Sequence, residues 1–227
     1  MILTLPGVLD ASEVAHCRSL LDAVAWVDGK VTAGAQSARA KRNLQVPEDA
    51  PEAKALRDLV LDRLGRTPAF VSAALPAKVF PPLFNRYDEG MGFGDHIDNA
   101  IRFGGEHRQR YRTDLSCTLF LSDPDDYDGG ELVIDGVCGK QTVKLPAGDM
   151  VLYPASTVHR VAPVTRGSRW ASFFWVQSMI RADAQRDLLY ELDRAIIDAQ
   201  ASLGDDHATV IRLTGTYHNL LRMWAEV

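Results

Sequence analysis

The sequence predicts a mainly β fold, with a double-stranded β-helix (jelly roll) core, flanking helices and a C-terminal helical appendage. From about residue 67, short runs of β-forming residues recur between Gly, Pro and Asp, as in a jelly roll built from two sheets. Before that point, and again after residue 178, apolar residues recur at the spacing of amphipathic helices. A chain of 227 residues suits one large domain, or one domain with an appendage.

Composition narrows the class of protein. The formal net charge of −5 argues against a general nucleic-acid binder, which would need a basic surface, so no nucleic-acid partner is expected. Cys17, Cys117 and Cys138 are odd in number and widely spaced, which indicates packing residues in a reducing compartment. No secretion signal and no apolar run of about 18 residues is evident, so we expect a soluble cytoplasmic protein without membrane contact. An oligomer is compatible with this composition.

Two helices are expected in the N-terminal part, residues 8–66. The first begins at Asp10, which forms a capping-box pattern with Glu13 three residues later. The second begins near Pro51, because proline suits the first turn of a helix. Between these helices the small, polar residues 28–42 indicate a loop with three basic residues near its end.

The β core is expected over residues 67–178, within a domain of residues 1–178, and residues 179–227 are expected to form a C-terminal helical segment. About eight short strands are predicted, with turn residues between them. They are Ala69–Leu75, Lys78–Tyr87, Thr113–Ser122, Glu131–Asp135, Gln141–Leu145, Asp149–Tyr153, His159–Val164 and Trp170–Gln177.

A His-x-Asp pair, His96 and Asp98, is the first feature that indicates chemistry. Residues i and i+2 of an extended strand share a face, so both side chains can bind one metal ion. A second histidine, His159, follows in a later strand pattern. Two imidazoles and one carboxylate are the ligands of non-haem Fe(II) oxygenases and leave three coordination positions open. Zinc, which accepts the same ligands, is the alternative metal, and an ordinary surface pair of hydrogen-bonded side chains is the alternative without a metal.

Arg169 follows His159 by ten residues and begins a strongly apolar strand. A guanidinium at the mouth of a buried strand needs an anion, and its planar fork fits a carboxylate. That anion is either a protein Asp or Glu or the far carboxylate of 2-oxoglutarate. Beside an iron site the second is the better candidate, because the keto acid would chelate the metal through its other end.

Several segments of the chain together resemble one family of enzymes. They are Tyr87-x-x-Gly90-x-x-Phe93-x-x-His96-x-Asp98, Asp128-Gly129-Gly130-Glu131-Leu132, Gly148-Asp149-Met150-Val151-Leu152-Tyr153, and His159 with Arg169. This set is similar to the prolyl-4-hydroxylase-like 2-oxoglutarate/Fe(II)-dependent dioxygenases, and most similar to the bacterial PKHD-type hydroxylases. The resemblance covers the β core and extends towards both helical ends.

The resemblance implies a role for each residue of the site. His96, Asp98 and His159 would bind Fe(II), and Arg169 would anchor 2-oxoglutarate as the co-substrate. Dioxygen would take the remaining position on the iron. The resemblance also implies L-ascorbate, which keeps iron of this kind reduced.

The co-substrate contacts beyond the arginine are less clearly defined. Asn85-Arg86-Tyr87 is similar to a motif of the oxidative alkylation-repair demethylases, in which the Asn and Tyr positions meet 2-oxoglutarate. The animal prolyl hydroxylases offer a tyrosine from a core strand, and this chain has Phe120 there instead. Phe120 has no hydroxyl group, so Tyr87, Asn85 or Thr118 fills the gap, or nothing does.

The resemblance implies hydroxylation of an unactivated C–H bond with release of succinate and carbon dioxide. Asp98 favours this outcome, because the related halogenases lack that carboxylate. The substrate is expected to be a small molecule or a peptidyl group. Two other functions are open alternatives: an oxidative nucleic-acid demethylase, and a non-catalytic iron- or oxygen-responsive binding module.

Residues 102–112 follow the ligand strand and contain four arginines, Arg102, Arg108, Arg110 and Arg112. One interpretation is a solvated surface loop. The other is a lid, closing at Gly104 and Gly105, that attracts an anionic substrate.

The last predicted strand contains four aromatic residues, Trp170, Phe173, Phe174 and Trp175. Because they run continuously along one strand, they are expected to lie in the hydrophobic core and not in a substrate pocket.

Overall fold

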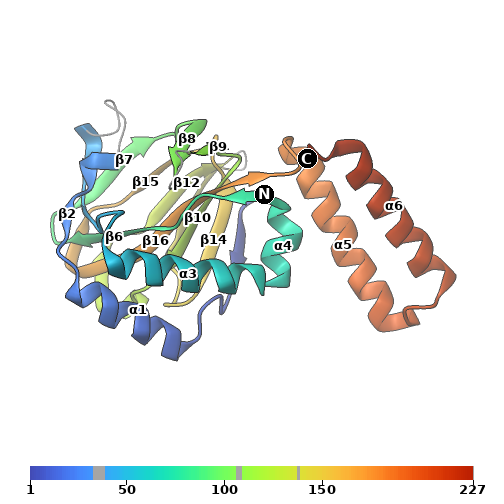
Figure 1. The fold of residues 1–227 in the computed structure, drawn as a ribbon, viewed down its shortest axis with the longest axis horizontal. Coiled ribbons are helices and arrows are strands. Elements are labelled where there is room, and N and C mark those ends of the chain that lie inside the picture. The colour runs from blue at the N-terminus through green and yellow to red at the C-terminus, as the bar shows by residue number, and fades with distance from the viewer. Residues whose placement is uncertain (33–38, 106–108, 137–138, 227) are drawn as a thin grey trace.

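The computed structural model of the protein describes residues 1–32, 39–105, 109–136 and 139–226. Two antiparallel sheets face each other, as the jelly-roll prediction requires (Figure 1). The larger sheet consists, in spatial order, of β1 (Leu3–Leu5), β14 (Met150–Pro154), β10 (Leu115–Phe120), β16 (Val164–Ser178), β6 (Leu83–Asp88), β4 (Leu44–Gln45) and β2 (Val27–Asp28). Strands β5 (Pro76–Val79) and β11 (Tyr127–Gly129) also pair with β16.

The smaller sheet holds the two histidines of the predicted metal site, His96 and His159. It consists, in spatial order, of β13 (Gly139–Val143), β12 (Leu132–Gly136), β15 (Val158–Val161), β7 (Gly92–His96) and β3 (Lys41–Arg42). A separate hairpin, β8 (Ile101–Gly104) with β9 (Gln109–Arg112), follows β7 along the chain. Short 3₁₀ turns, η1 (Gly29–Thr32) and η2 (Pro124–Asp126), complete the β domain in the described part of the chain.

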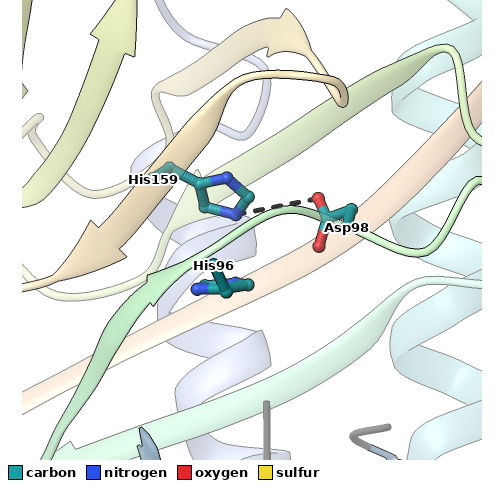
Figure 2. A group of neighbouring side chains, drawn as sticks. All are labelled: His96, Asp98 and His159. Carbon is teal, nitrogen blue, oxygen red and sulfur yellow. Dashed lines mark ion pairs between the residues drawn. The ribbon is translucent and has the colours of Figure 1, made fainter. Parts of the chain in front are cut away.

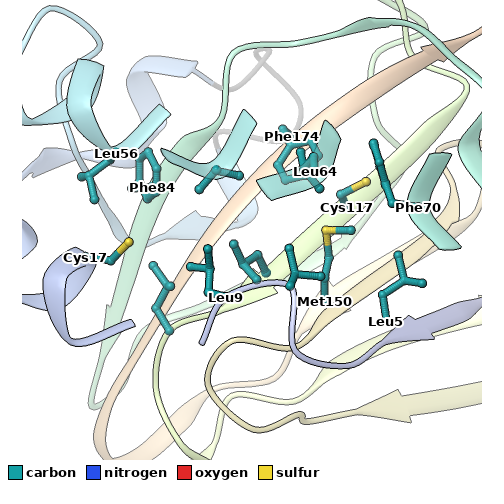
Figure 3. Close-up of a cluster of buried hydrophobic side chains, with 14 of the residues drawn as sticks. Leu5, Leu9, Cys17, Leu56, Leu64, Phe70, Phe84, Cys117, Met150 and Phe174 are labelled. Atoms are coloured by element: carbon teal, nitrogen blue, oxygen red, sulfur yellow. The ribbon is translucent and has the colours of Figure 1, made fainter. Parts of the chain in front are cut away.

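Helices α1 (Ala11–Ala23) and α3 (Pro51–Gly65) cover the outer face of the larger sheet (Figure 1). The predicted capping box at the start of α1 is present, since the Glu13 amide donates to Asp10 and the Asp10 amide donates to Glu13, both at 2.9 Å. The main hydrophobic core fills the space between these helices and the sheet (Figure 3). Cys17 and Cys117 are free and buried in this core, as predicted for packing residues, while Cys138 lies outside the described residues.

One predicted strand is wrong, because the residues expected as Ala69–Leu75 form helix α4 (Pro68–Ala74). Phe70, Ala73 and Ala74 recur at helical spacing and are all buried, so a helix buries them on one side. Leu75 then ends the helix with a left-handed backbone, φ 43°. After this helix the chain enters the sheets at β5, although the short strands β1 to β4, which come before residue 67, also belong to them.

The region predicted as a loop, residues 28–42, contains short elements at both ends. Its first residues belong to β2 and η1, and Lys41 with Arg42 forms β3, which pairs with β7 at the edge of the smaller sheet. Residues 33–38 lie outside the described residues. The pairing of β3 with β7 matters for the site, because it brings Lys41 beside the ligand strand.

The C-terminal residues form a helix pair, α5 (Asp183–Leu203) and α6 (Ala208–Trp224), beside the β domain (Figure 1). The pair contacts the β domain through a separate apolar cluster around Leu75, Ile180 and Leu189. Ser72 of α4 also donates a hydrogen bond to Asp193 of α5 at 2.6 Å. None of the helices in the described part of the chain is long and apolar enough to cross a membrane.

Candidate metal centre and co-substrate pocket

The structure brings the three predicted metal ligands together. His96 ends β7, Asp98 follows two residues later, and His159 lies on the neighbouring strand β15, where it pairs in register with His96. Each residue offers a ligand atom within 4.8 Å of the others, and the three side chains point towards a common space (Figure 2). The antiparallel pairing of two strands far apart in the sequence is what builds this cluster.

Hydrogen bonds orient both imidazole rings. Nδ1 of His96 lies 2.8 Å from the carbonyl oxygen of Gly94, and Nδ1 of His159 lies 2.9 Å from that of Thr157. A carbonyl only accepts, so in each neutral ring Nδ1–H is the donor and Nε2 keeps its lone pair. Such contacts to the outer nitrogen are what metal-binding histidines generally make.

Asp98 is held by a side chain that the sequence analysis did not identify. The hydroxyl group of Ser116, on β10 of the opposite sheet, donates to Oδ2 of Asp98 at 2.5 Å. The same oxygen lies 3.7 Å from Nε2 of His159. The bond from Ser116 fixes the carboxylate towards the two imidazoles, and its other oxygen remains to bind a cation.

The surroundings of His96 favour the neutral ring that a metal needs. Burial lowers the pKa of His96 to about 4, and the neighbouring His159 contributes in the same direction. The ring also stacks on Phe93, with centroids 3.6 Å apart. A lowered pKa means that protons compete weakly for this nitrogen near neutral pH.

The donor set fits a divalent iron ion. Two imidazole nitrogens and one carboxylate lie within 4.8 Å of one another, and these are the donor types of non-haem Fe(II) sites, which keep open positions for other ligands. The open side faces a pocket of about 760 Å³, including its mouth, to which all three residues contribute. The roles of His96, Asp98 and His159 as iron ligands remain predictions that this geometry supports.

Arg169 lies in the same pocket and is almost fully buried, with 1% of its surface exposed. It lies on β16, opposite Tyr87 of β6, and its guanidinium is 5.5 Å from the Tyr87 ring and 5.1 Å from the Phe120 ring. Its Nε and Nη2 atoms have no hydrogen-bond partner among the described residues. A buried cation with free donors is costly, so this position calls for an anionic ligand.

The other predicted co-substrate residues surround this arginine. Tyr87, Asn85 and Thr118 are buried and line the pocket. Burial raises the pKa of Tyr87 to about 12, so its hydroxyl group stays protonated and can donate a hydrogen bond. The side-chain oxygen of Asn85 has no partner among the described residues. Phe120 lies against Arg169, where its ring offers packing but no hydroxyl group.

The two ends of the arginine-containing segment, residues 102–112, pair with each other as the strands β8 and β9. Arg108 lies outside the described residues. The four arginines do not share one role. Arg112 bonds Asp114 at 2.7 and 3.0 Å and Glu226 at 2.6 Å, which is a structural contact. Arg110 is exposed, whereas Arg102 turns inward and lines the pocket.

The expectation that the aromatic residues of the last strand belong only to the core is wrong for three of them, because Phe173, Phe174 and Trp175 line the pocket. Side chains alternate along β16, so Trp170 and Phe174 belong to the core under the helices, while Phe173 and Trp175 form a separate apolar cluster. The alternation from Arg169 through 171 to 173 and 175 was available in the sequence, and it is the signal that identifies Phe173 and Trp175 as pocket residues.

Further pocket residues came from no sequence signal. Lys41 reaches the site only because β3 pairs with β7, and Tyr153 lies edge-on to His159 with ring centroids 5.2 Å apart. The pocket as a whole is lined by Lys41, Asn85, Tyr87, Phe93, His96, Ile97, Asp98, Asn99, Arg102, Ser116, Cys117, Thr118, Leu132, Tyr153, His159, Val161, Arg169, Phe173, Phe174 and Trp175.

Solved structures with this fold define its class. An oxidoreductase of the 2OG-Fe(II) oxygenase family from Burkholderia pseudomallei aligns with a TM-score of 0.55 at 18% identity, over 78% of this chain and 84% of its own. A Pseudomonas putida prolyl-4-hydroxylase aligns with a TM-score of 0.52 at 21% identity, over 78% and 92%. The model of the 2OG-Fe(II) oxygenase superfamily matches residues 82–177. The fold is thus that of the 2OG-Fe(II) oxygenases.

Closer relatives identify the family. A PKHD-type hydroxylase from Gluconobacter oxydans is 59% identical over 227 residues, and one from Pseudomonas putida is 58% identical over 227 residues, each over 100% of both chains. A model of the PKHD-type hydroxylase C-terminal domain matches residues 183–226, the helix pair. The chain belongs to the PKHD-type hydroxylases, as the resemblance in its motifs predicted. Membership of this family makes the chain a 2-oxoglutarate/Fe(II) dioxygenase and implies Fe(II), 2-oxoglutarate and dioxygen.

Proposed function

We propose that this dioxygenase hydroxylates an unactivated C–H bond of a small-molecule or peptidyl substrate, with His96, Asp98 and His159 as the iron ligands. The distal carboxylate of 2-oxoglutarate binds Arg169. The bound iron supplies the redox chemistry by which dioxygen oxidises two partners at once. One oxygen atom enters succinate as carbon dioxide is lost from 2-oxoglutarate, and the other enters the substrate as a hydroxyl group.

The observation that supports this function most is the state of Arg169. Its guanidinium is 1% exposed, shares a pocket with the three ligands and has two nitrogen atoms without a hydrogen-bond partner among the described residues. A bidentate carboxylate would satisfy these donors and neutralise the buried charge. A purely structural arginine would instead have a protein anion beside it.

The chain's own residues contribute binding, orientation and exclusion of water. The outer hydrogen bonds of His96 and His159 keep Nε2 of each ring directed at the metal position. Tyr87, with its protonated hydroxyl group, and Asn85, whose side-chain oxygen has no partner among the described residues, would contact the co-substrate, and Thr118 lines the same pocket. The aromatic wall, in which Phe173 and Trp175 line the pocket and Phe80 packs on Trp175, would limit the access of water and so strengthen these contacts.

Several finer points belong to the same proposal. L-ascorbate would act as a reductant that returns oxidised iron to Fe(II), as family resemblance implies. A cytoplasmic location, the oligomeric state and the absence of a nucleic-acid partner stay predictions; the net charge of −5 supports the last of them.

A ligand-binding experiment with Arg169→Leu tests the co-substrate assignment. Loss of a bidentate, charge-assisted pair should weaken 2-oxoglutarate binding by about ten- to a hundredfold, because such bonds are worth roughly 1.5–3 kcal/mol. The titration is made anaerobically with the metal bound, and metal affinity is measured separately and should not change. The matched control is Arg166→Leu, which removes an exposed arginine of the same strand that pairs with Asp128. Unchanged 2-oxoglutarate affinity in Arg169→Leu would refute the assignment.

Turnover of the ligand variants tests the iron site. His96→Ala, Asp98→Ala and His159→Ala should each abolish iron-dependent conversion of 2-oxoglutarate to succinate, while circular dichroism shows the β domain intact. Full activity in any one of them would show that the ligand set is wrong.

The parent protein is then incubated with iron, 2-oxoglutarate and a metabolite extract, and products heavier by one oxygen atom are sought by mass spectrometry. Coupled succinate release would exclude a non-catalytic binding module.

A further inference from the structure

The pocket contains a second pair of cations, Lys41 and Arg102, which the proposed iron and co-substrate sites do not use. Both side chains line the same pocket as the three candidate ligands. They come from different places in the fold, since Lys41 lies on β3 at the edge of the smaller sheet and Arg102 on the β8–β9 hairpin. Two positive charges on the wall of one pocket attract an anionic ligand.

Packing fixes the position of Arg102. Its guanidinium lies 4.0 Å from the centre of the Trp175 ring and 5.3 Å from that of Phe80, which are cation–π contacts. Gly104, two residues along the same strand, packs so closely on Phe80 that a Cβ atom would lie 2.5 Å from the ring. The hairpin therefore sits tightly on the aromatic wall and holds Arg102 against Trp175.

Lys41 is similarly held in the pocket. It is 4% exposed, with its Nζ atom 5.6 Å from the ring centres of both Phe93 and Phe173 and 3.4 Å from the side-chain oxygen of Gln45. Burial, and after it the positive charge of Arg102, lower the pKa of Lys41 to about 8, while the carboxylates of Asp28 and Asp98 act in the opposite direction. The two cations therefore act on each other, and an anion near both would relieve the repulsion.

The cation pair is separate from the predicted co-substrate anchor. Phe173 and Trp175, the aromatic partners of Lys41 and Arg102, follow Arg169 along the same strand by four and six residues. At about 3.3 Å per residue, their backbone positions lie roughly 13 and 20 Å from that of Arg169. We expect a keto acid that spans the metal and Arg169 to leave this end of the pocket open to the substrate.

We propose that Lys41 and Arg102 form a binding site for a carboxylate group of the substrate, with the adjacent apolar part of the substrate lying over Phe173 and Trp175. This inference rests on the proposed function, since it assumes that the other end of the pocket takes 2-oxoglutarate. Arg102 offers a planar guanidinium whose two parallel N–H groups match a carboxylate, and Lys41 adds a point charge from β3. The substrate class is an organic acid, or an acidic side chain of a peptide, whose C–H bond is presented to the metal between the two anion sites.

Matched acids and amides test this site directly. The probes are phenylacetate, 3-phenylpropionate and 4-phenylbutyrate, each with its neutral amide, and phenyl phosphate as a second kind of anion. The protein is first loaded with Mn²⁺ and 2-oxoglutarate under nitrogen, so that the proposed co-substrate site at Arg169 is already occupied. Binding of each probe is then measured by calorimetry and by ligand-observed NMR. At least one carboxylate should bind about tenfold more tightly than its amide, because a charge-assisted contact is lost in the amide.

Single variants locate the binding. Lys41→Met keeps the apolar contacts of the lysine stem, and Arg102→Gln keeps a planar group over Trp175; each should weaken carboxylate binding by about tenfold while the Kd for 2-oxoglutarate stays within about twofold. Arg110→Gln, which removes an exposed arginine of the same hairpin, is the control with the same change in charge. It should leave carboxylate binding unchanged.

Three results would overturn the inference. They are equal binding of acids and amides, absence of any carboxylate binding, and tighter binding of phenyl phosphate that the two variants do not affect. A loss of 2-oxoglutarate affinity in Lys41→Met or Arg102→Gln as large as the loss of carboxylate affinity would also overturn it, by assigning these residues to the co-substrate. Failure of the proposed function itself is seen separately, as the absence of 2-oxoglutarate binding and turnover in the parent protein.

Discussion

At the scale of the residue, the orientation of each candidate metal ligand depends on a hydrogen bond with a neighbouring residue that is not itself a ligand. Ser116, Gly94 and Thr157 each hold one of the three candidate ligands, through a hydroxyl group or a backbone carbonyl. The two backbone contacts are independent of side-chain identity. The contact from Ser116 is the one that a substitution can remove without changing a ligand.

Ser116→Ala should lower the affinity for a divalent metal by about ten- to a hundredfold, the range seen when such outer contacts are lost. The reason is that the carboxylate of Asp98 would lose the 2.5 Å hydrogen bond that orients it. Metal affinity is measured by competition of Mn²⁺ against a chelator. Ser172→Ala is the control, because Ser172 is also buried but its hydroxyl group has no partner among the described residues. Equal metal affinity in both variants would show that Ser116 does not position Asp98.

At the scale of the element, the β8–β9 hairpin packs closely on the aromatic wall because one of its residues, Gly104, has no side chain. Gly104 leaves room for the ring of Phe80, and Arg102 on the same strand stacks on Trp175. Ile101 and Phe103 alternate with these two residues and are exposed, at 45% and 58%. The hairpin thus has one face that packs on the pocket and one that faces solvent.

Gly104→Ala should destabilise the protein by about 1–3 kcal/mol, the usual cost of forcing an extra carbon into a packed site. The added Cβ would lie 2.5 Å from the Phe80 ring, so the hairpin or the ring must shift. Urea unfolding measures the change, and the double variant Gly104→Ala/Phe80→Leu should show a smaller additional loss than the two single changes predict. Gly215→Ala provides a control of opposite sign, because a Cβ there meets nothing within 4 Å and alanine favours a helix. Equal stability of Gly104→Ala and the parent would contradict the close packing.

At the scale of the whole molecule, the C-terminal helix pair is joined to the β domain close to the hairpin. Arg112 of β9 bonds Asp114, the carbonyl oxygen of Ser178, and Glu226 beyond α6. The apolar cluster around Ile180 and Leu189 lies beside these contacts. The C-terminal end of the chain, just beyond α6, is therefore tied to the second strand of the hairpin, which lies beside the pocket.

Arg112→Met and Glu226→Gln should differ strongly in stability. The side chain of Asp114 is 7% exposed, so removing Arg112 leaves a buried carboxylate without its cation, at a cost of about 3–5 kcal/mol. The side chain of Glu226 is 53% exposed, so its neutralisation should cost about 0–1 kcal/mol. Thermal and urea unfolding of both variants provide the comparison. Similar losses in the two would mean that the buried pair with Asp114 is not the dominant contact.

Much of the fold and of the candidate site was predictable from local pattern. The capping box of Asp10, the alternating strands and the two helical ends depend on neighbours within a few residues, and these are visible in the sequence. His96, Asp98, His159 and Arg169 were identified for a similar reason, since each stands in a short motif. The strand predicted at Ala69–Leu75 failed because a run of small and apolar residues suits either a strand or a short helix, and burial against other elements decides between them.

The fold class and the family could be read from the sequence alone, and so could the candidate ligands, because strand period, turn residues and motif spacing are local properties of the chain. The set of side chains that share the pocket, in contrast, depends on the tertiary structure. Ser116, Lys41 and Arg102 reach the pocket from three different elements, through pairings between strands that are distant in the sequence. The physical reason is that strand pairing brings together residues separated by tens of positions, and no local pattern specifies which strand will lie beside which.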